Sequence, residues 1–309
     1  MGRYALSLVI PVGPNDDARL QNLLASIDRQ AFPKASLEVI ICRRGNSEEA
    51  RAQGIRQAQG DIIACLDADN QLLGFEFLRR LWEAASQPDV VGAYPSHYAW
   101  FADDPPLNRY FALLGANDPL CWWLGHADRR SWLVAPRTEH VVFGRSIPTL
   151  GSNAFFVKRA IIQRFLTGFP GHIDICERMR RAGYATYTIV DSVVWHHTGD
   201  TLLAWLKKRY CYVDTLYWQR AEERDWRMVG SPMDYYRVAT FALASLVVLP
   251  HLWLSLRGYR RVRDHAWFLH PPLCSAVTCL YALVAIRHLW RVLSPVPHAQ
   301  RATERSSPA

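Results

Sequence analysis

The sequence has 309 residues, half of which are hydrophobic, and a formal net charge of +8 at pH 7. This length can form one large α/β domain with an appended segment. The charge favours an anionic partner, such as a sugar nucleotide or an anionic membrane surface. The seven cysteines lack any Cys-x-x-Cys pair. They favour small core residues in a reducing compartment, and they argue against a disulfide framework or a zinc site.

Strands and helices alternate in the N-terminal third of the sequence. Apolar runs predict strands over 4–12, 37–42, 62–66 and 90–94, and spaced apolar residues predict helices from Asn15 onward, over 48–59 and over 75–86. This order predicts an α/β fold with a doubly wound, mostly parallel sheet and helices on both faces. The loops after Val12, Cys42 and Leu66 would then share one edge of the sheet, where ligands bind in such folds.

Two carboxylates, Asp67 and Asp69, directly follow the apolar strand over 62–66. A solvated turn would contain the same residues. Carboxylate oxygens are also the ligands that Mg²⁺ prefers, and the ion is often shared with substrate phosphates. The pair therefore predicts a divalent cation, Mg²⁺ or Mn²⁺, that holds a diphosphate at this edge.

Six short segments stand out along the sequence. They are Ser7-Leu-Val-Ile-Pro-Val12, Ala50-Arg-Ala-Gln-Gly-Ile55, Gly60-Asp-Ile-Ile-Ala-Cys-Leu-Asp-Ala-Asp-Asn70, Gly151-Ser-Asn-Ala-Phe155, Arg178-Met-Arg-Arg-Ala-Gly-Tyr184 and Val194-Trp-His-His197. In this order and spacing the sequence resembles the family 2 glycosyltransferases over roughly residues 5–215. The resemblance implies the GT-A fold and a membrane-associated bacterial type. It also implies an inverting enzyme that moves a sugar from a nucleotide-sugar donor to a lipid-linked or polysaccharide acceptor.

The resemblance also implies where the donor binds. Asp67 and Asp69 would hold the metal and the diphosphate, Pro11 would lie on the donor side, and His196 or its neighbour His197 would complete the metal site. The loop after the second strand normally carries an aspartate for the base or ribose. This sequence has Arg43 and a second arginine there, which could reach a phosphate or point into solvent.

The expected general base lies before the helix that contains Arg-Ala-Gly. In the family an acidic pair stands there, and the register places Gly171 and His172 at the pair, with Asp174 two residues later. Histidine is a common general base, and Asp174 could act if the loop shifts by one turn. Alternatively, Asp174 only caps the helix and His172 is a turn residue.

Two further regions complete the predicted site. The irregular, tryptophan-rich stretch over 97–147 corresponds to the acceptor side in the family, although many of its aromatics could be core residues. The amphipathic helix over 202–220 combines basic and aromatic residues, which suits a membrane surface. In membrane-bound members such a helix lies beside the donor, so Lys207 and Arg209 could contact phosphate.

The segments over 238–256 and 267–286 are nearly free of charge, and each approaches the ~20 residues that cross a bilayer. Two spans would place the arginines between them outside, so a re-entrant or interfacial hairpin is an equal alternative. We therefore expect a GT-A domain over 1–230, a membrane-associated hairpin over 231–294 and a disordered tail over 295–309. The protein would sit at the inner or plasma membrane, with its catalytic domain in the cytoplasm.

Other functions are less well supported by the sequence. The unusual residues at positions 43 and 172 would also suit a catalytically degenerate GT-A scaffold in a cell-envelope assembly. A membrane-linked nucleotidyltransferase would need a glycine-rich phosphate loop near the first strand, which the sequence lacks. We expect no nucleic-acid partner, because the basic residues cluster beside the apolar, membrane-like segments.

Overall fold

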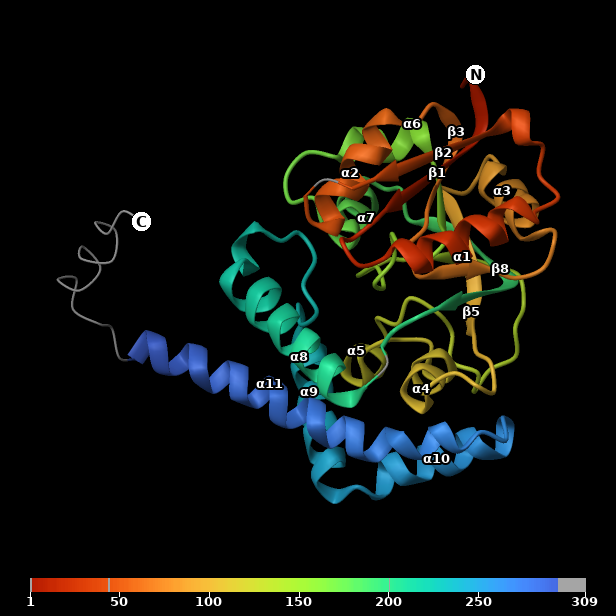
Figure 1. Ribbon diagram of the computed structural model, residues 1–309. Helices are drawn as coiled ribbons and strands as arrows, with labels where there is room; N and C mark the ends of the chain where they lie inside the picture. Colours follow the sequence, from red (N-terminus) through yellow and green to blue (C-terminus); the bar gives the residue numbers. More distant parts are fainter. Residues whose placement is uncertain (1, 44, 200, 294–309) are drawn as a thin grey trace.

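The computed structural model describes residues 2–43, 45–199 and 201–293, so the predicted tail over 295–309 lies outside the described residues. An eight-stranded sheet forms the centre (Figure 1), with the order β2-β1-β3-β7-β5-β8-β4 and with β6 pairing to β8. The strands are β1 (Tyr4–Pro11), β2 (Leu37–Cys42), β3 (Gly60–Cys65), β4 (Asn70–Leu72), β5 (Gly92–Ala99), β6 (Glu139–Val142), β7 (Phe155–Lys158) and β8 (Thr186–His196).

The sheet is mostly parallel, as predicted. Strand β1 runs parallel to β2 and β3, while β7 is antiparallel to both β3 and β5. Strands β5 and β8 therefore point the same way as β1, and their carboxyl ends lie at the same edge. Strand β8 is the longest, and it pairs with β5, β4 and β6 at different points along its length.

Helices cover both faces of the sheet. They are α1 (Asp17–Asp28), α2 (Ser47–Gln57), α3 (Phe77–Ser86), α4 (Pro106–Leu114), α5 (Pro119–Trp123), α6 (Arg159–Ile162), α7 (His172–Arg181), α8 (Leu202–Tyr212), α9 (Pro232–Val247), α10 (Leu249–Arg261) and α11 (His270–Leu293). Side chains alternate along β1, so Leu6 and Leu8 pack with α1 and α3, whereas Val9 packs with α2 and α7 on the other face. This alternation produces the two hydrophobic cores that hold the strand ends in place.

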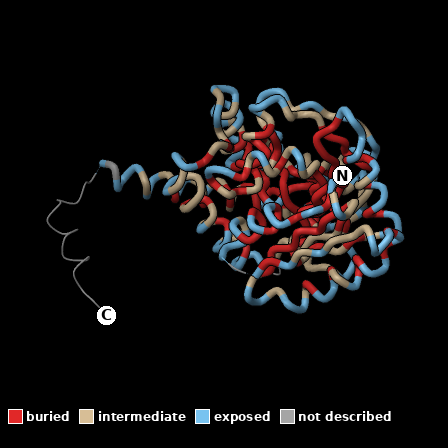
Figure 2. The backbone as a smooth tube through the Cα atoms, turned by 90° about the horizontal axis from the view of Figure 1, so that it is seen from above, coloured by how far each residue is buried: buried red, intermediate tan, exposed pale blue. Residues whose placement is uncertain are grey.

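The C-terminal helices pack against α4 and α5, below the sheet in Figure 1. Within the described residues, one helical segment, His265–Arg291, is long and apolar enough to cross a membrane, with a mean hydropathy of 1.6. The last turns of α11 project from the body of the molecule and are largely exposed, as Figure 2 shows. Trp267 and Cys274, by contrast, join the same hydrophobic core as the sheet.

The predicted span over 238–256 is not one continuous helix. It is divided between α9 and α10, which meet at an angle of 86°. Val248 at the break has a positive φ of 68°, and Pro250 lies in the first turn of α10. Proline supplies no backbone N–H and its ring clashes with the preceding turn, so a straight helix cannot continue through it. A pair bent in this way fits a broken span as well as a re-entrant hairpin.

Candidate active site

A cavity of about 450 Å³ opens at the edge where the parallel strands end. The end of β1, the start of α2, the loop after β3, the start of α7, the end of β8 and helix α8 all contribute to its walls. Of the predicted site residues, it brings together Pro11, Asp67, Asp69, His172, His196 and Arg209.

Asp67 meets a buried arginine at the floor of this cavity. Its Oδ1 accepts a hydrogen bond of 2.6 Å from the Arg51 guanidinium. The same guanidinium donates to Glu48 Oε2 at 2.7 Å. Burial acts to lower the pKa of Arg51, but these two carboxylates raise it well above its usual range. Arg51 is therefore a fixed cation that links Asp67 to Glu48.

Asp69 pairs with His196 across the loop. Asp69 Oδ1 lies 3.1 Å from His196 Nδ1. Burial acts to raise the pKa of Asp69, yet the adjacent imidazole lowers it, and the carboxylate raises the pKa of His196 in return. Asn70 ties this pair to the rest of the loop, because its Oδ1 accepts from the Asp67 backbone N–H at 3.0 Å and its Nδ2 lies 3.3 Å from His196 Nδ1.

His172 stands at the first position of α7 with a carboxylate behind it. Its Nδ1 lies 2.7 Å from Glu48 Oε1, and its backbone N–H donates to Glu48 Oε2 at 2.9 Å. Burial acts to raise the pKa of Glu48, but His172 and Arg51 lower it well below its usual range, so the carboxylate is ionised. An ionised acceptor at Nδ1 favours a proton on that nitrogen, so Nε2 is the nitrogen available to other groups.

Asp174 does not reach the cavity. Its side chain is fully buried, and its carboxylate pairs with Arg224 at 2.8 Å. Its Oδ1 also accepts from the backbone N–H groups of Asp225 and Trp226, at 2.8 and 2.9 Å. The expectation that Asp174 acts as the base is corrected here, because a helical residue two positions after His172 points to a different side of α7.

Two other predicted donor contacts also lie outside the cavity walls. Arg43 is half-exposed and pairs with Asp17 at 2.8 Å, while Lys207 points into solvent on α8. The next residue on that helix, Lys208, lines the cavity instead. Arg209 is buried, and its guanidinium donates to the Asn117 backbone and side-chain oxygens at 3.0 Å each.

Comparisons with known proteins agree with this arrangement. The family model described as Glycosyl transferase family 2 matches residues 15–162. Residues 15–162 therefore form a family 2 glycosyltransferase domain. No curated protein matches the sequence. Among solved structures, a mannosyltransferase from Pyrobaculum calidifontis, PcManGT in complex with GDP-Man and Mn²⁺, matches with a TM-score of 0.52 and 15% identity, covering 93% of this chain and 88% of that one. At this identity the likeness shows the fold, which is GT-A.

In this glycosyltransferase, two cavity residues could not be assigned from the sequence. Glu48 and Arg51 lie three residues apart in the first turns of α2 and therefore share a face. Asn46 caps that helix by accepting from the N–H groups of Glu48 and Glu49, at 3.0 Å each. The Ala50-Arg-Ala-Gln-Gly-Ile55 segment carried the family resemblance, but nothing in its spacing indicated that the arginine binds Asp67.

The cavity of the glycosyltransferase contains oxygen and nitrogen atoms that could bind a hard divalent cation. The side chains of Asp67 and Asp69 are 24% and 21% exposed, so both carboxylates reach the cavity. The contacts with Arg51 and His196 use Oδ1 of each aspartate, and no hydrogen bond from the described parts of the chain reaches either Oδ2. Oxygen ligands of this kind suit Mg²⁺ or Mn²⁺, and a neutral imidazole is a compatible third ligand.

Replacing Asp174 with asparagine is expected to destabilise this glycosyltransferase without removing a catalytic group. Loss of one partner from a buried ion pair leaves Arg224 uncompensated, which costs about 3–5 kcal/mol of unfolding free energy. Urea unfolding followed by tryptophan fluorescence measures the change. Glu223→Gln breaks an exposed pair nearby and should have almost no effect. An Asp174→Asn protein of wild-type stability that has lost activity would restore Asp174 as a candidate base.

Proposed function

We propose that this chain is a metal-dependent, inverting glycosyltransferase that transfers a sugar to a hydroxyl of a lipid-linked acceptor. The main support for nucleotide-sugar binding is that Asp67 and Asp69 both face the cavity at the carboxyl edge of the sheet. Together with His196, they would hold Mg²⁺ or Mn²⁺. When bound, that ion would neutralise charge on the departing nucleoside diphosphate.

Basic residues on α8 would complete the diphosphate site. Lys208 lowers the pKa of Asp69, after the larger effects of burial and His196, so its ammonium group lies within electrostatic reach of the carboxylate. Arg209 is held by Asn117 and by Asp118, whose Oδ2 is 3.5 Å from its Nη1. A guanidinium fixed in this way presents its charge without losing conformational entropy when an anion binds. Pro11 forms the opposite wall at the end of β1.

His172 would serve as the general base. Its Nε2 would accept the proton of the acceptor hydroxyl as the oxygen attacks the anomeric carbon on the face opposite the leaving diphosphate. Glu48 would orient the ring and stabilise the imidazolium that forms, as a carboxylate does behind many catalytic histidines. Arg51 binds both Glu48 and Asp67 and would keep the distance between the base and the donor site fixed.

A second cavity, of about 760 Å³, supports a lipid-linked acceptor. It lies between the segment Val213–Gln219 and helices α9 and α11, and it is lined largely by apolar residues. Tyr217 lines both this cavity and the donor cavity. An apolar chain in the second cavity would therefore have its polar head close to the sugar of the donor.

The outer surface of the C-terminal helices supports binding to a membrane. Large apolar side chains there are exposed, among them Leu243, Leu246, Leu249, Trp253, Leu283, Ile286, Trp290 and Leu293. Arginines follow on the same helices, at the end of α10 and near the end of α11. Exposed apolar residues beside basic ones are typical of helices that enter the interface of an anionic bilayer. The membrane would deliver the acceptor to the second cavity.

The function can be tested with the full chain in detergent or lipid nanodiscs. We expect transfer from at least one of a panel of nucleotide sugars to glycolipids in a membrane extract, with Mn²⁺ and not with EDTA. Mass spectrometry identifies the product. Failure of every donor to react or bind would support the alternative, a catalytically degenerate scaffold. The arginine bound to Asp67 and the histidine at position 172 would also be compatible with such a scaffold.

Replacing Ala242 with tryptophan is expected to block the acceptor cavity. Ala242 lines this cavity from α9. A large ring there should displace part of the lipid chain and raise KM for the lipid acceptor by about 10-fold or more, since a single methylene in an apolar pocket is worth about 1–3 kcal/mol. Hydrolysis of the donor should be unchanged. Ala239→Trp is the matched control, because Ala239 is exposed on the same helix. Equal effects of the two substitutions would contradict a lipid site in this cavity.

A further inference from the structure

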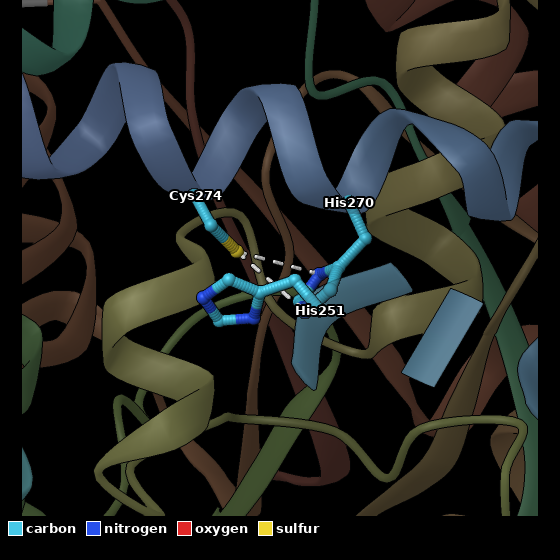
Figure 3. Close-up of side chains that lie close together, drawn as sticks. All are labelled: His251, His270 and Cys274. Atoms are coloured by element: carbon cyan, nitrogen blue, oxygen red, sulfur yellow. Dashed lines mark hydrogen bonds between the residues drawn. The ribbon is translucent and has the colours of Figure 1, made fainter. Parts of the chain in front are cut away.

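Three side chains that commonly bind metals meet inside the C-terminal helices, outside the donor cavity. They are His251 from α10 and His270 and Cys274 from α11, and all three are buried. One nitrogen or sulfur atom of each lies within 4.8 Å of the others. His270 and Cys274 are four residues apart and so share a face of α11. Figure 3 shows the Cys274 sulfur pointing toward the His270 ring, with the His251 ring beside it.

The surroundings of His251 leave one of its nitrogens without a partner. Ser245 Oγ donates its proton to the Phe241 carbonyl oxygen at 2.9 Å, so it can only accept from His251 Nε2, which lies 3.2 Å away. This arrangement favours the tautomer with the proton on Nε2 and a lone pair on Nδ1. This Nδ1 is buried and has no hydrogen-bond partner within the described residues. Buried polar atoms usually have a partner, and this lone pair is available to a metal ion.

His270 and Cys274 show the spacing of two metal ligands. Tyr110 Oη lies 2.7 Å from His270 Nδ1 and can accept a proton from it, which leaves a lone pair on Nε2. A metal-binding histidine is usually oriented by a hydrogen bond from the ring nitrogen that does not bind the metal. The His270 Nε2 and Cys274 Sγ atoms are 3.5 Å apart. In a tetrahedral zinc site, Zn–N and Zn–S bonds of ordinary length place nitrogen and sulfur about 3.5 Å apart.

We propose that His251 Nδ1, His270 Nε2 and Cys274 Sγ form a zinc site distinct from the donor site. The thiol would release its proton to solvent as the thiolate binds Zn²⁺, and a water molecule would take the fourth position. A thiolate and two imidazoles favour Zn²⁺ over Mg²⁺, whereas the carboxylates of the donor site favour the harder ion. The zinc would fasten α10 to α11 and, through Tyr110, both of them to α4.

A zinc site at His251, His270 and Cys274 differs from what the cysteine spacing predicts. The absence of a Cys-x-x-Cys pair argued against zinc, but only one thiolate is needed when histidines supply the other ligands. His270 and Cys274 are visible in the sequence as a helical i, i+4 pair. His251 joins them only because α10 turns back along α11 after the break at Val248, which the spacing does not reveal.

Cobalt substitution tests the proposal on the wild-type chain. The full protein in detergent is stripped with a chelator and titrated with Co²⁺, which gives thiolate-to-cobalt charge-transfer absorption only when sulfur is a ligand. We expect one Co²⁺ per chain with this absorption, and its loss when one equivalent of Zn²⁺ is added. A folded wild-type protein that develops no such absorption would overturn the proposal, whatever the variants do.

Variants locate the ligands and separate this site from the donor site. Cys274→Ser and His251→Gln should each abolish the charge-transfer absorption and the rise in melting temperature caused by Zn²⁺. Cys279→Ser should preserve both, because Cys279 is exposed on the same helix. Asp69→Asn should also preserve both, whether or not that variant transfers sugar. Retention of the absorption in Cys274→Ser, or its loss in Cys279→Ser, would contradict the assignment.

Discussion

Replacing Asp69 with asparagine is expected to lower sugar transfer by about 100- to 1000-fold, the range seen when one preorganised electrostatic group at a transition state is removed. The neutral amide cannot balance a divalent cation, and the donor diphosphate would lose its counter-charge. The loss should appear mainly in kcat at saturating Mn²⁺. Because His196 also loses its carboxylate partner, activity should be expressed per folded molecule, with circular dichroism as the measure of folding.

Asp61→Asn is the matched control for this experiment. Asp61 is an exposed carboxylate at the start of β3, near Arg159 and the backbone of Gly2. The same substitution there changes the net charge equally, yet it lies at the opposite end of the strand from the cavity. Its activity should therefore equal that of the wild type. An Asp69→Asn enzyme that keeps more than about a tenth of wild-type transfer would refute the metal assignment.

Replacing His172 with alanine is expected to reduce kcat by about 100- to 10,000-fold, which is the usual contribution of a general base. Donor binding should persist, because His172 is assigned to the acceptor proton and not to the diphosphate. Glu48→Gln should reduce kcat by less, since the imidazole would remain in place while its orientation and its cationic form lost support. Initial rates with saturating donor and a titrated acceptor separate kcat from KM.

His140→Ala provides the control for an exposed histidine of the same chain, on β6. It should transfer sugar as well as the wild type. Full activity of His172→Ala with a hydroxyl acceptor would contradict the role of His172 as the base. Such a result would instead favour an acceptor oxygen that is already ionised, such as that of a lipid phosphate, since that nucleophile needs no proton removed.

The fold was predictable because its strongest signals are local. The strand over 62–66 is apolar throughout, as expected for a strand buried on both faces, and the aspartates that follow it lie at the expected edge. The alternating order of strands and helices was enough to predict the parallel sheet. The reversed direction of β7 was not predictable, because its neighbours β3 and β5 are distant in sequence and no local pattern specifies the pairing.

The site was only partly predictable, because several of its contacts join residues far apart in the chain. His172 emerged from the family register, but its partner Glu48 lies 124 residues earlier. Asp174 was assigned to the site because nothing in the sequence indicates Arg224, which is 50 residues later and occupies its carboxylate. Lys207 and Lys208 differ by one position on α8, and a helix turns about 100° per residue, so the basic pattern alone could not select between them.

Whether Asp67 and Asp69 hold a metal that binds the donor is tested most directly by calorimetric titration of the wild-type protein and of the Asp67→Asn, Asp69→Asn double variant with nucleoside diphosphates. GDP and UDP serve as probes, each with Mn²⁺ and with EDTA. We expect that at least one nucleotide binds the wild-type protein with Mn²⁺, that EDTA abolishes this binding, and that the double variant binds neither nucleotide. Equal affinity with and without the metal, or undiminished binding by the double variant, would contradict a metal site at Asp67 and Asp69.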